Sequence, residues 1–275
     1  MSDRRPKPQH LNTPTPRRRH DGKELVRRQF GANAEAYVRS AVHGHAPSLA
    51  RLVEVARPRA DWRVLDVSTG GGHTALAFAP HVRQVVATDL SSEMLAAAER
   101  FAGERGVTNV EFQTADAEAL PFPDASFDLV TNRIALHHYP EPRRAIAGMA
   151  RVLRAGGLLV LVDNVVPPDR QTAGYVNAVE KLRDPSHQWC FPRVRLETYL
   201  TEAGLTVEHA EDSYKEMDFE DWADRMGCDA PKKEKLRSLI CDAPEEARAH
   251  FHPRLEGDRL RFSLGETLLA ARRPE

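Results

Sequence analysis

The chain has few cysteines, no long apolar run and little net charge, and each of these features excludes some classes of protein. Cys190, Cys228 and Cys241 are widely spaced and form no CxxC pair, which excludes a fold built on disulfides and favours a reducing compartment. No segment approaches the roughly 20 apolar residues of a membrane span. The basic N-terminus also lacks the apolar segment of a secretory signal. We therefore expect a cytoplasmic protein with no membrane span.

The net charge of -1 conceals an uneven distribution along the 275 residues. The first 23 residues contain seven Lys or Arg and two Asp, so the remainder, with 32 basic and 38 acidic residues, is mildly acidic. An acidic body is a poor match for a phosphate backbone, which disfavours nucleic acid as the main substrate. We expect residues 1–22, which are rich in proline and arginine, to be a disordered basic tail, and residues 23–275 to form one domain.

The most informative segment reads RVLDVSTGGG at residues 63–72. An apolar strand leads into an acidic residue, a glycine-rich turn and a helix-forming run from His73 to Ala79. Small residues let backbone N–H groups approach a ligand closely, and the following helix directs its positive end toward it. This order predicts a site for a nucleotide-like cofactor.

Strands and helices then alternate along the first half of the chain. Further strands are predicted at Gln84–Asp89, Val110–Thr114 and Phe127–Asn132. A helix capped by Ser91 or Ser92 follows the second strand, and a helix at Arg143–Leu153 that ends at Gly156-Gly157 precedes a fifth strand. This spacing indicates right-handed crossovers and a parallel sheet covered on both faces.

The remaining segments are less regular. Two helices are expected within residues 23–56, a strand at Thr206–His209, a helical insertion over roughly Phe219–His250, and a strand at Leu260–Ala271 with a turn at Gly265. Two more helices are expected at Gln171–Arg183 and Arg193–Ala203.

The glycine turn, Asp116, LPFPDASFDLV at residues 120–130 and RVLRAGG at 151–157 together resemble the class I S-adenosylmethionine-dependent methyltransferases. The resemblance is to the small-molecule branch, similar to the ubiquinone and menaquinone methyltransferases with a methyltransferase type 11 domain. RDPSH at residues 183–187 looks like a bacterial subgroup of unassigned substrate. The implied fold is α/β, a Rossmann-like seven-stranded, mostly parallel sheet with helices on both faces. A helical cap from about 164–205 and 212–258 would lie over the cofactor pocket.

The resemblance also implies which residues hold S-adenosyl-L-methionine. Asp89 would grip the ribose, because one carboxylate can accept from two hydroxyls, and Asp66 would anchor the ammonium. One position departs from the family, since Ser68 stands where glycine is usual, and serine fits there if its φ is negative. The other candidates are Gly70, Gly71 and Gly72 beside the methionine, Leu90, Met94, Asp116 and Ala117 around the adenine, Tyr37 over the methionine end, and Asn132 where donor and acceptor meet.

Three histidines are candidates for the base that takes a proton from the acceptor: His137, His138 and His187, the last paired with Asp184. Each could instead be a packed or capping residue. A metal site is not expected, since His43 and His45 bring no carboxylate or cysteine at ligand spacing to the pair at 137–138. The expected activity is methyl transfer to a small, apolar or aromatic organic acceptor on oxygen, carbon or nitrogen, by a monomer or homodimer.

Three alternatives remain open from the sequence. Gly70, Gly72 and Ala75 satisfy the G-x-G-x-x-A pattern of dinucleotide sites, so an NAD-binding protein is one. A cofactor-binding module without catalysis is the second, because binding residues are more evident than catalytic ones. An RNA methyltransferase, suggested by the basic tail, is the third.

Overall fold

The computed structural model describes residues 19–31, 34–38 and 47–275. Three helices precede the first strand: α1 (Arg19–Gly31), α2 (Ala34–Val38) and α4 (Pro47–Ala56). Helix α1 begins inside the segment predicted as a tail. Its residues Lys23, Val26 and Phe30 recur at helical spacing, so their side chains lie on one side of the helix, where they line a cavity.

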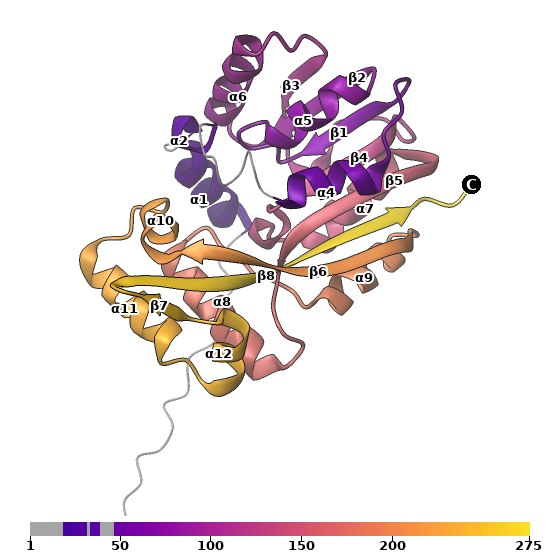
Figure 1. Ribbon diagram of the computed structural model, residues 1–275. Coiled ribbons are helices and arrows are strands. Elements are labelled where there is room, and N and C mark those ends of the chain that lie inside the picture. Colours follow the sequence, from indigo (N-terminus) through magenta and orange to yellow (C-terminus); the bar gives the residue numbers. More distant parts are fainter. Residues whose placement is uncertain (1–18, 32–33, 39–46) are drawn as a thin grey trace, which may run out of the picture.

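A mixed sheet forms the centre of the molecule (Figure 1). Its order is β3-β2-β1-β4-β5-β8-β6, with β1 to β5 parallel, β8 antiparallel to its neighbours, and the short β7 paired with β8. The α/β fold and the first four strands are confirmed, while the predicted seven strands are eight with β7. The strands are β1 (Arg63–Val67), β2 (Gln84–Asp89), β3 (Val110–Thr114), β4 (Phe127–Arg133), β5 (Leu153–Val165), β6 (Thr206–Asp218), β7 (Arg254–Glu256) and β8 (Arg259–Arg272).

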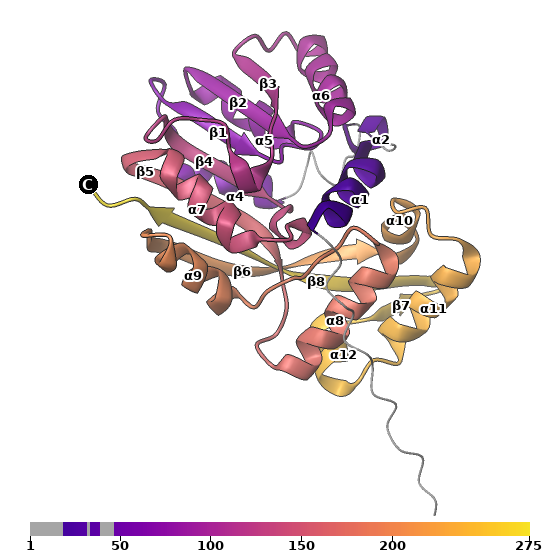
Figure 2. The ribbon, with the colours of Figure 1, turned by 180° about the vertical axis from the view of Figure 1, so that it is seen from behind.

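Helices cover both faces of the sheet (Figures 1 and 2). Helices α4 and α5 (His73–Phe78) bury Leu52 and Phe78 against one face. Helices α7 (Pro142–Val152) and α9 (Arg193–Glu202) bury Ile146 and Leu200 against the other. Helix α6 (Ser92–Glu104) follows β2, and Ser91 caps it by accepting from the Met94 amide at 3.2 Å, as predicted. Apolar helix stripes and apolar strands thus form one continuous core.

The predicted end of the helix before the fifth strand is wrong. Helix α7 ends at Val152, and β5 starts at Leu153, so Gly156 and Gly157 lie inside the strand. Gly156 has a φ of 72°, and its amide donates to Arg273, while the Arg273 amide donates back to Gly157. The glycine pair therefore shapes the start of β5 instead of ending the helix.

Strand β6 is far longer than predicted, and with β8, which exceeds its predicted length by one residue at each end, it extends beyond the sheet into a second core. There they meet α8 (Arg170–Arg183), α10 (Phe219–Asp224), α11 (Ala230–Cys241) and α12 (Glu245–Phe251), a layer that we call the cap (Figure 2). Gly265 makes no turn and lies within β8: a side chain there would meet the Val165 carbonyl oxygen at 3.1 Å. Helix α9, in contrast, packs on the sheet with α7.

None of the helices in the described part of the chain has the length and apolar content needed to cross a membrane.

Candidate active site

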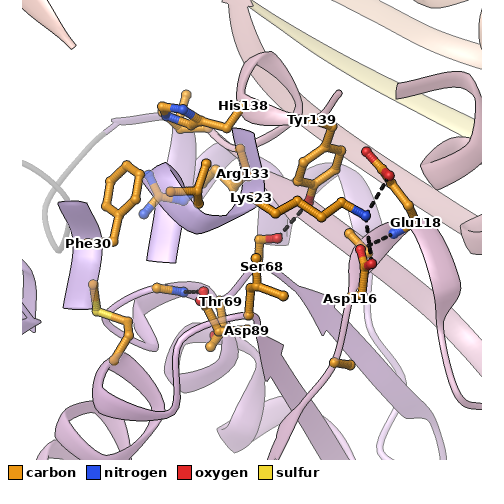
Figure 3. A pocket seen from close by; sticks show the side chains of 18 of the residues that line it. Lys23, Phe30, Ser68, Thr69, Asp89, Asp116, Glu118, Arg133, His138 and Tyr139 are labelled. Atoms are coloured by element: carbon orange, nitrogen blue, oxygen red, sulfur yellow. Dashed lines mark hydrogen bonds and ion pairs between the residues drawn. The ribbon is translucent and has the colours of Figure 1, made fainter. Parts of the chain in front are cut away.

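A large cavity lies at the carboxyl ends of β1, β2 and β4, beneath helix α1 (Figure 3). It encloses about 990 Å³ of non-protein space, part of which is open to solvent. In open α/β sheets, ligands bind at this edge, where the strand order reverses. The side chains that line it include Lys23, Val26, Phe30, Ser68, Thr69, Thr74, Asp89, Leu90, Met94, Asp116, Glu118, Arg133, Ile134, His138 and Tyr139, with backbone from Gly70 and Gly71.

Asp89, the last residue of β2, is held in one orientation by two backbone amides. Its Oδ2 accepts from the Gly70 N–H and its Oδ1 from the Ser91 N–H, both at 3.0 Å. Burial raises the pKa of Asp89, and these hydrogen bonds oppose the increase. Each oxygen keeps a lone pair, so the carboxylate can accept two further hydrogen bonds from a ligand in the cavity.

Ser68 adopts a left-handed backbone, with φ of 56°, so the negative φ assumed for it from the sequence is wrong. Its hydroxyl lies 2.6 Å from the Tyr139 hydroxyl. Asn132 donates from Nδ2 to the same Tyr139 oxygen at 2.8 Å and to the Val67 carbonyl at 2.9 Å. Asn132 is fully buried and does not line the cavity, so it contacts the site through Tyr139.

Asp66 lies beneath the cavity wall, with a side chain only 1% exposed. Its oxygens accept from the Thr69 hydroxyl at 2.6 Å and the Thr131 hydroxyl at 2.7 Å. Burial raises the pKa of Asp66 to about 6 against these two hydrogen bonds. The carboxylate therefore supports the glycine turn from below.

Lys23 extends from α1 across the cavity to two acidic residues (Figure 3). Its Nζ lies 2.6 Å from Asp116 Oδ2 and 2.6 Å from Glu118 Oε2. Burial by itself lowers the pKa of Lys23, but the hydrogen bonds to Asp116 and Glu118 outweigh it and raise the pKa. Asp116 Oδ1 meanwhile caps a short helical turn by accepting from the Glu118 amide at 2.9 Å.

A second cavity adjoins the first, between the sheet edge and the cap, and encloses about 570 Å³ of space, again partly open to solvent. Phe30, Ile134 and His138 line both cavities and so mark their junction. Ile134 has a φ of 53°, a rare conformation for a β-branched residue. Such backbone strain is concentrated at functional sites.

The three predicted histidines converge at this second cavity. The ring centroids of His137 and His138 are 4.2 Å apart, and those of His137 and His187 are 5.6 Å apart. His137 Nδ1 lies 2.5 Å from Asp163 Oδ1, and although burial lowers its pKa, Asp163 outweighs that effect and raises it. Burial and the neighbouring His137 lower the pKa of His138 to about 4, so His138 is neutral at pH 7.

His187 and Asp184 lie in a tight turn of the RDPSH segment. Asp184 Oδ1 accepts from the Ser186 amide at 2.7 Å and the Ser186 hydroxyl at 2.6 Å. His187 Nε2 donates to Asn177 Oδ1 at 2.9 Å, and burial lowers the His187 pKa well below its usual value. The turn therefore packs His187 firmly while presenting it to the second cavity.

Most of the residues predicted to bind the cofactor lie either on the surface of the first cavity or behind its wall. Lining the first cavity are Gly70, Gly71, Asp89, Leu90, Met94, Asp116, Ala117 and His138, whereas Asp66 and Asn132 lie behind its wall. Gly72 has a φ of 80° and faces away, since a side chain there would meet Ala98 at 3.2 Å. The Tyr37 side chain and both His43 and His45 lie outside what the structure describes.

Several cavity residues were missed from the sequence, notably Lys23, Glu118 and Tyr139. Lys23 stands at the boundary assigned to the basic tail, but its spacing from Val26 and Phe30 places the three on one helix face. That periodicity was the available signal. No sequence pattern predicts the contact between the Tyr139 and Ser68 hydroxyls, because the two residues are 71 positions apart.

An open sheet with this strand order, a glycine turn after β1 and an acidic residue ending β2 define a class I methyltransferase. Comparison with known proteins agrees: the model of a methyltransferase domain family matches residues 65–161. The chain is 37% identical over 222 residues to the uncharacterized methyltransferase YcgJ of Bacillus subtilis, covering 81% of this chain and 88% of that protein. The chain belongs to this methyltransferase family, in its small-molecule type.

Two other proteins extend the comparison. The crystal structure of BH2331 from Bacillus halodurans C-125 superposes with a TM-score of 0.79 and is 40% identical, covering 82% of this chain and 99% of that one. The 27-O-demethylrifamycin SV methyltransferase of Amycolatopsis mediterranei is 33% identical over 232 residues, 82% of each chain.

Proposed function

We propose that this protein binds S-adenosylmethionine in the first cavity and transfers its methyl group to a small molecule held in the second. The orientation of Asp89 carries the proposal, because two backbone amides fix a carboxylate that lines the cavity and can still accept two further hydrogen bonds. A ribose diol offers the two matching donors. Family membership supports the same donor.

The remaining lining fits the other parts of the cofactor. Gly70 and Gly71 provide close backbone beside the amino-acid end, and Leu90 and Met94 provide apolar surface for the adenine. Asp116 can accept from the exocyclic amine, with Lys23 competing for its Oδ2 at 2.6 Å. Asp66 and Asn132 act through the turn and Tyr139 that they support.

When bound, S-adenosylmethionine supplies a methyl carbon on a sulfonium, whose carbon–sulfur electron pair stays on sulfur as the acceptor's electron pair forms the new bond. This chain aligns the acceptor and removes its proton. His138 is our candidate for the base, since it lines both cavities and is neutral. Ser186 gives its hydroxyl hydrogen to Asp184, so its oxygen accepts from His138 Nδ1–H, which leaves His138 Nε2 unprotonated.

The proposal is tested by calorimetric titration of the purified protein with S-adenosylhomocysteine and, in parallel, with NAD. We expect S-adenosylhomocysteine to bind with a micromolar dissociation constant and NAD to give no heat of binding. Binding of NAD without binding of S-adenosylhomocysteine would assign the site to a dinucleotide. Binding without transfer to any metabolite fraction would favour a non-catalytic module.

A further inference from the structure

The second cavity is lined by charged side chains that the methyl-donor site does not explain. Its lining includes the cations Arg183, Lys215 and Arg225 and the acids Glu180 and Asp184. Arg183 is satisfied locally, because its Nη1 lies 3.3 Å from Glu180 Oε2 and its guanidinium stacks 4.6 Å from the Trp222 ring centroid. Lys215 has no comparably close carboxylate among the described residues.

Lys215 carries a partly buried charge without a close partner. Within the described part of the chain, the nearest carboxylate to its Nζ is Glu266 Oε2 at 3.8 Å, too far for a hydrogen bond. Its side chain is 22% exposed, and burial lowers the pKa of the ammonium despite Glu266. An ammonium removed from water is stable only when an anion or hydrogen-bond acceptors replace that water. A ligand with an acid group supplies such a partner.

Three other polar atoms of the same lining lack a hydrogen-bond partner among the described residues: Asn164 Oδ1, Glu180 Oε1 and Trp222 Nε1. Glu180 and Trp222 are 5% and 1% exposed. Buried polar atoms are almost always paired in native proteins, so unpaired ones clustered at a cavity indicate a missing partner. The set comprises two acceptors and one donor.

Apolar side chains also line this cavity. Phe30 and Ile134 lie at the junction with the first cavity, while Met217 and Leu264 lie beside Lys215, which is paired with Leu264 across β6 and β8. A ligand that fits this lining has an apolar body that reaches the junction and polar groups near Lys215. An aromatic or aliphatic body therefore remains compatible with this site.

We infer that the methyl acceptor carries an acid group, a carboxylate or a phosphate monoester, that binds Lys215 and the Trp222 N–H in the second cavity. This inference rests on the proposed function and assigns the acceptor class for the same site. An O–H or N–H donor on the acceptor satisfies Asn164 and Glu180. Its apolar body occupies the junction formed by Phe30 and Ile134.

Pairs of an aromatic acid and a neutral counterpart with the same ring test the inference. The full-length protein, saturated with S-adenosylhomocysteine, is titrated with benzoate and benzamide, and with phenyl phosphate and phenol, by ligand-observed NMR. We expect at least one acid to bind about tenfold more tightly than its neutral partner, as charge-assisted hydrogen bonds do. The pair with the larger ratio of affinities shows whether the site prefers a carboxylate or a phosphate.

In the variant Lys215→Met, the acid and its neutral partner should bind with dissociation constants within twofold of each other. In the control Lys235→Met, which removes an exposed charge from α11, the preference for the acid should remain. Since Lys215→Met removes a positive charge near Glu266, Lys215→Met/Glu266→Gln serves as a second, charge-balanced variant. Equal binding of acid and neutral probes, absence of binding by both acids, or a preference that survives both Lys215 variants would overturn the inference. Failure of S-adenosylhomocysteine to bind the wild type would instead refute the proposed function.

Discussion

Replacement of Asp89 by asparagine tests the contact on which the proposed cofactor site depends. In the wild type, each carboxylate oxygen accepts one backbone hydrogen bond, at 3.0 Å, and retains a lone pair for the ligand. Asparagine keeps one acceptor oxygen, and its Nδ2 cannot accept from an amide. One of the amides of Gly70 and Ser91 then loses its partner, and one ribose hydroxyl loses its acceptor.

The magnitude follows from the number and charge of the lost contacts. A hydrogen bond to a charged group contributes about 1.5–3 kcal/mol, and asparagine retains one weaker, neutral bond. The expected net loss is about 2–3 kcal/mol, or roughly 30- to 150-fold in the dissociation constant of S-adenosylhomocysteine. Isothermal titration calorimetry measures this change directly.

The matched control is Glu99→Gln, which removes one exposed carboxylate from α6 without touching the cavity. Its affinity should equal that of the wild type. Thermal denaturation of both variants shows whether the fold is preserved, since Asp89→Asn also leaves one backbone amide unpaired. A change of less than twofold in Asp89→Asn, with the fold intact, would refute the assignment of this carboxylate to the ribose.

Three further predictions concern the surroundings of the cavity. Because residue 68 has a positive φ, Ser68→Gly should be about 1 kcal/mol more stable to urea than Ser68→Ala, and equal stability would contradict the left-handed backbone. Lys23→Met removes the competitor for Asp116 and should tighten S-adenosylhomocysteine binding by up to about fivefold, the size of a partly exposed ion pair; weaker binding would show that Lys23 holds the cofactor. The pKa of Asp66 rises from 3.8 to about 6 on folding, so its stabilising contribution is present below about pH 4 and is lost as the pH rises through 6. Urea unfolding should show about 3 kcal/mol of this loss in the wild type but not in Asp66→Asn, and an identical pH dependence in both proteins would exclude Asp66 as its source.

The structural features that were predicted correctly are those that short segments of the sequence determine. The first four strands alternate with amphipathic helices, so their positions follow from periodicity alone. The glycine turn, Asp89, Leu90 and Met94 fall within one strand-turn-helix unit and its neighbour, so local spacing brings them to the same edge. The position of His137 and His138 just after β4 marked them as candidates, and resemblance to a known family added His187, which lies 50 residues beyond His137 yet converges with it.

What the sequence could not predict depends on contacts between distant segments. Strand β6 is polar along most of its length, so no apolar alternation marks the 13 residues that pairing with β8 holds extended. Gly265 looked like a turn residue, but glycine is required there because Val165 and His250 approach its backbone. The contacts of Lys23 with Asp116 and Glu118 likewise exist only once α1 has packed over the sheet edge.

The continuity of β6 and β8 determines how this molecule can open. Both strands run from the sheet core to the cap core, and they pair with each other from Thr206–Arg272 to Asp218–Arg261, with one register shift between Val207 and His209. A hinge between the two lobes would have to rupture that ladder, so the cap is a fixed wall. Movement of α1, which borders both cavities through Phe30 and contacts the cap through Gln29 Nε2 and Met226 Sδ at 3.4 Å, would therefore widen the cavities without breaking the ladder.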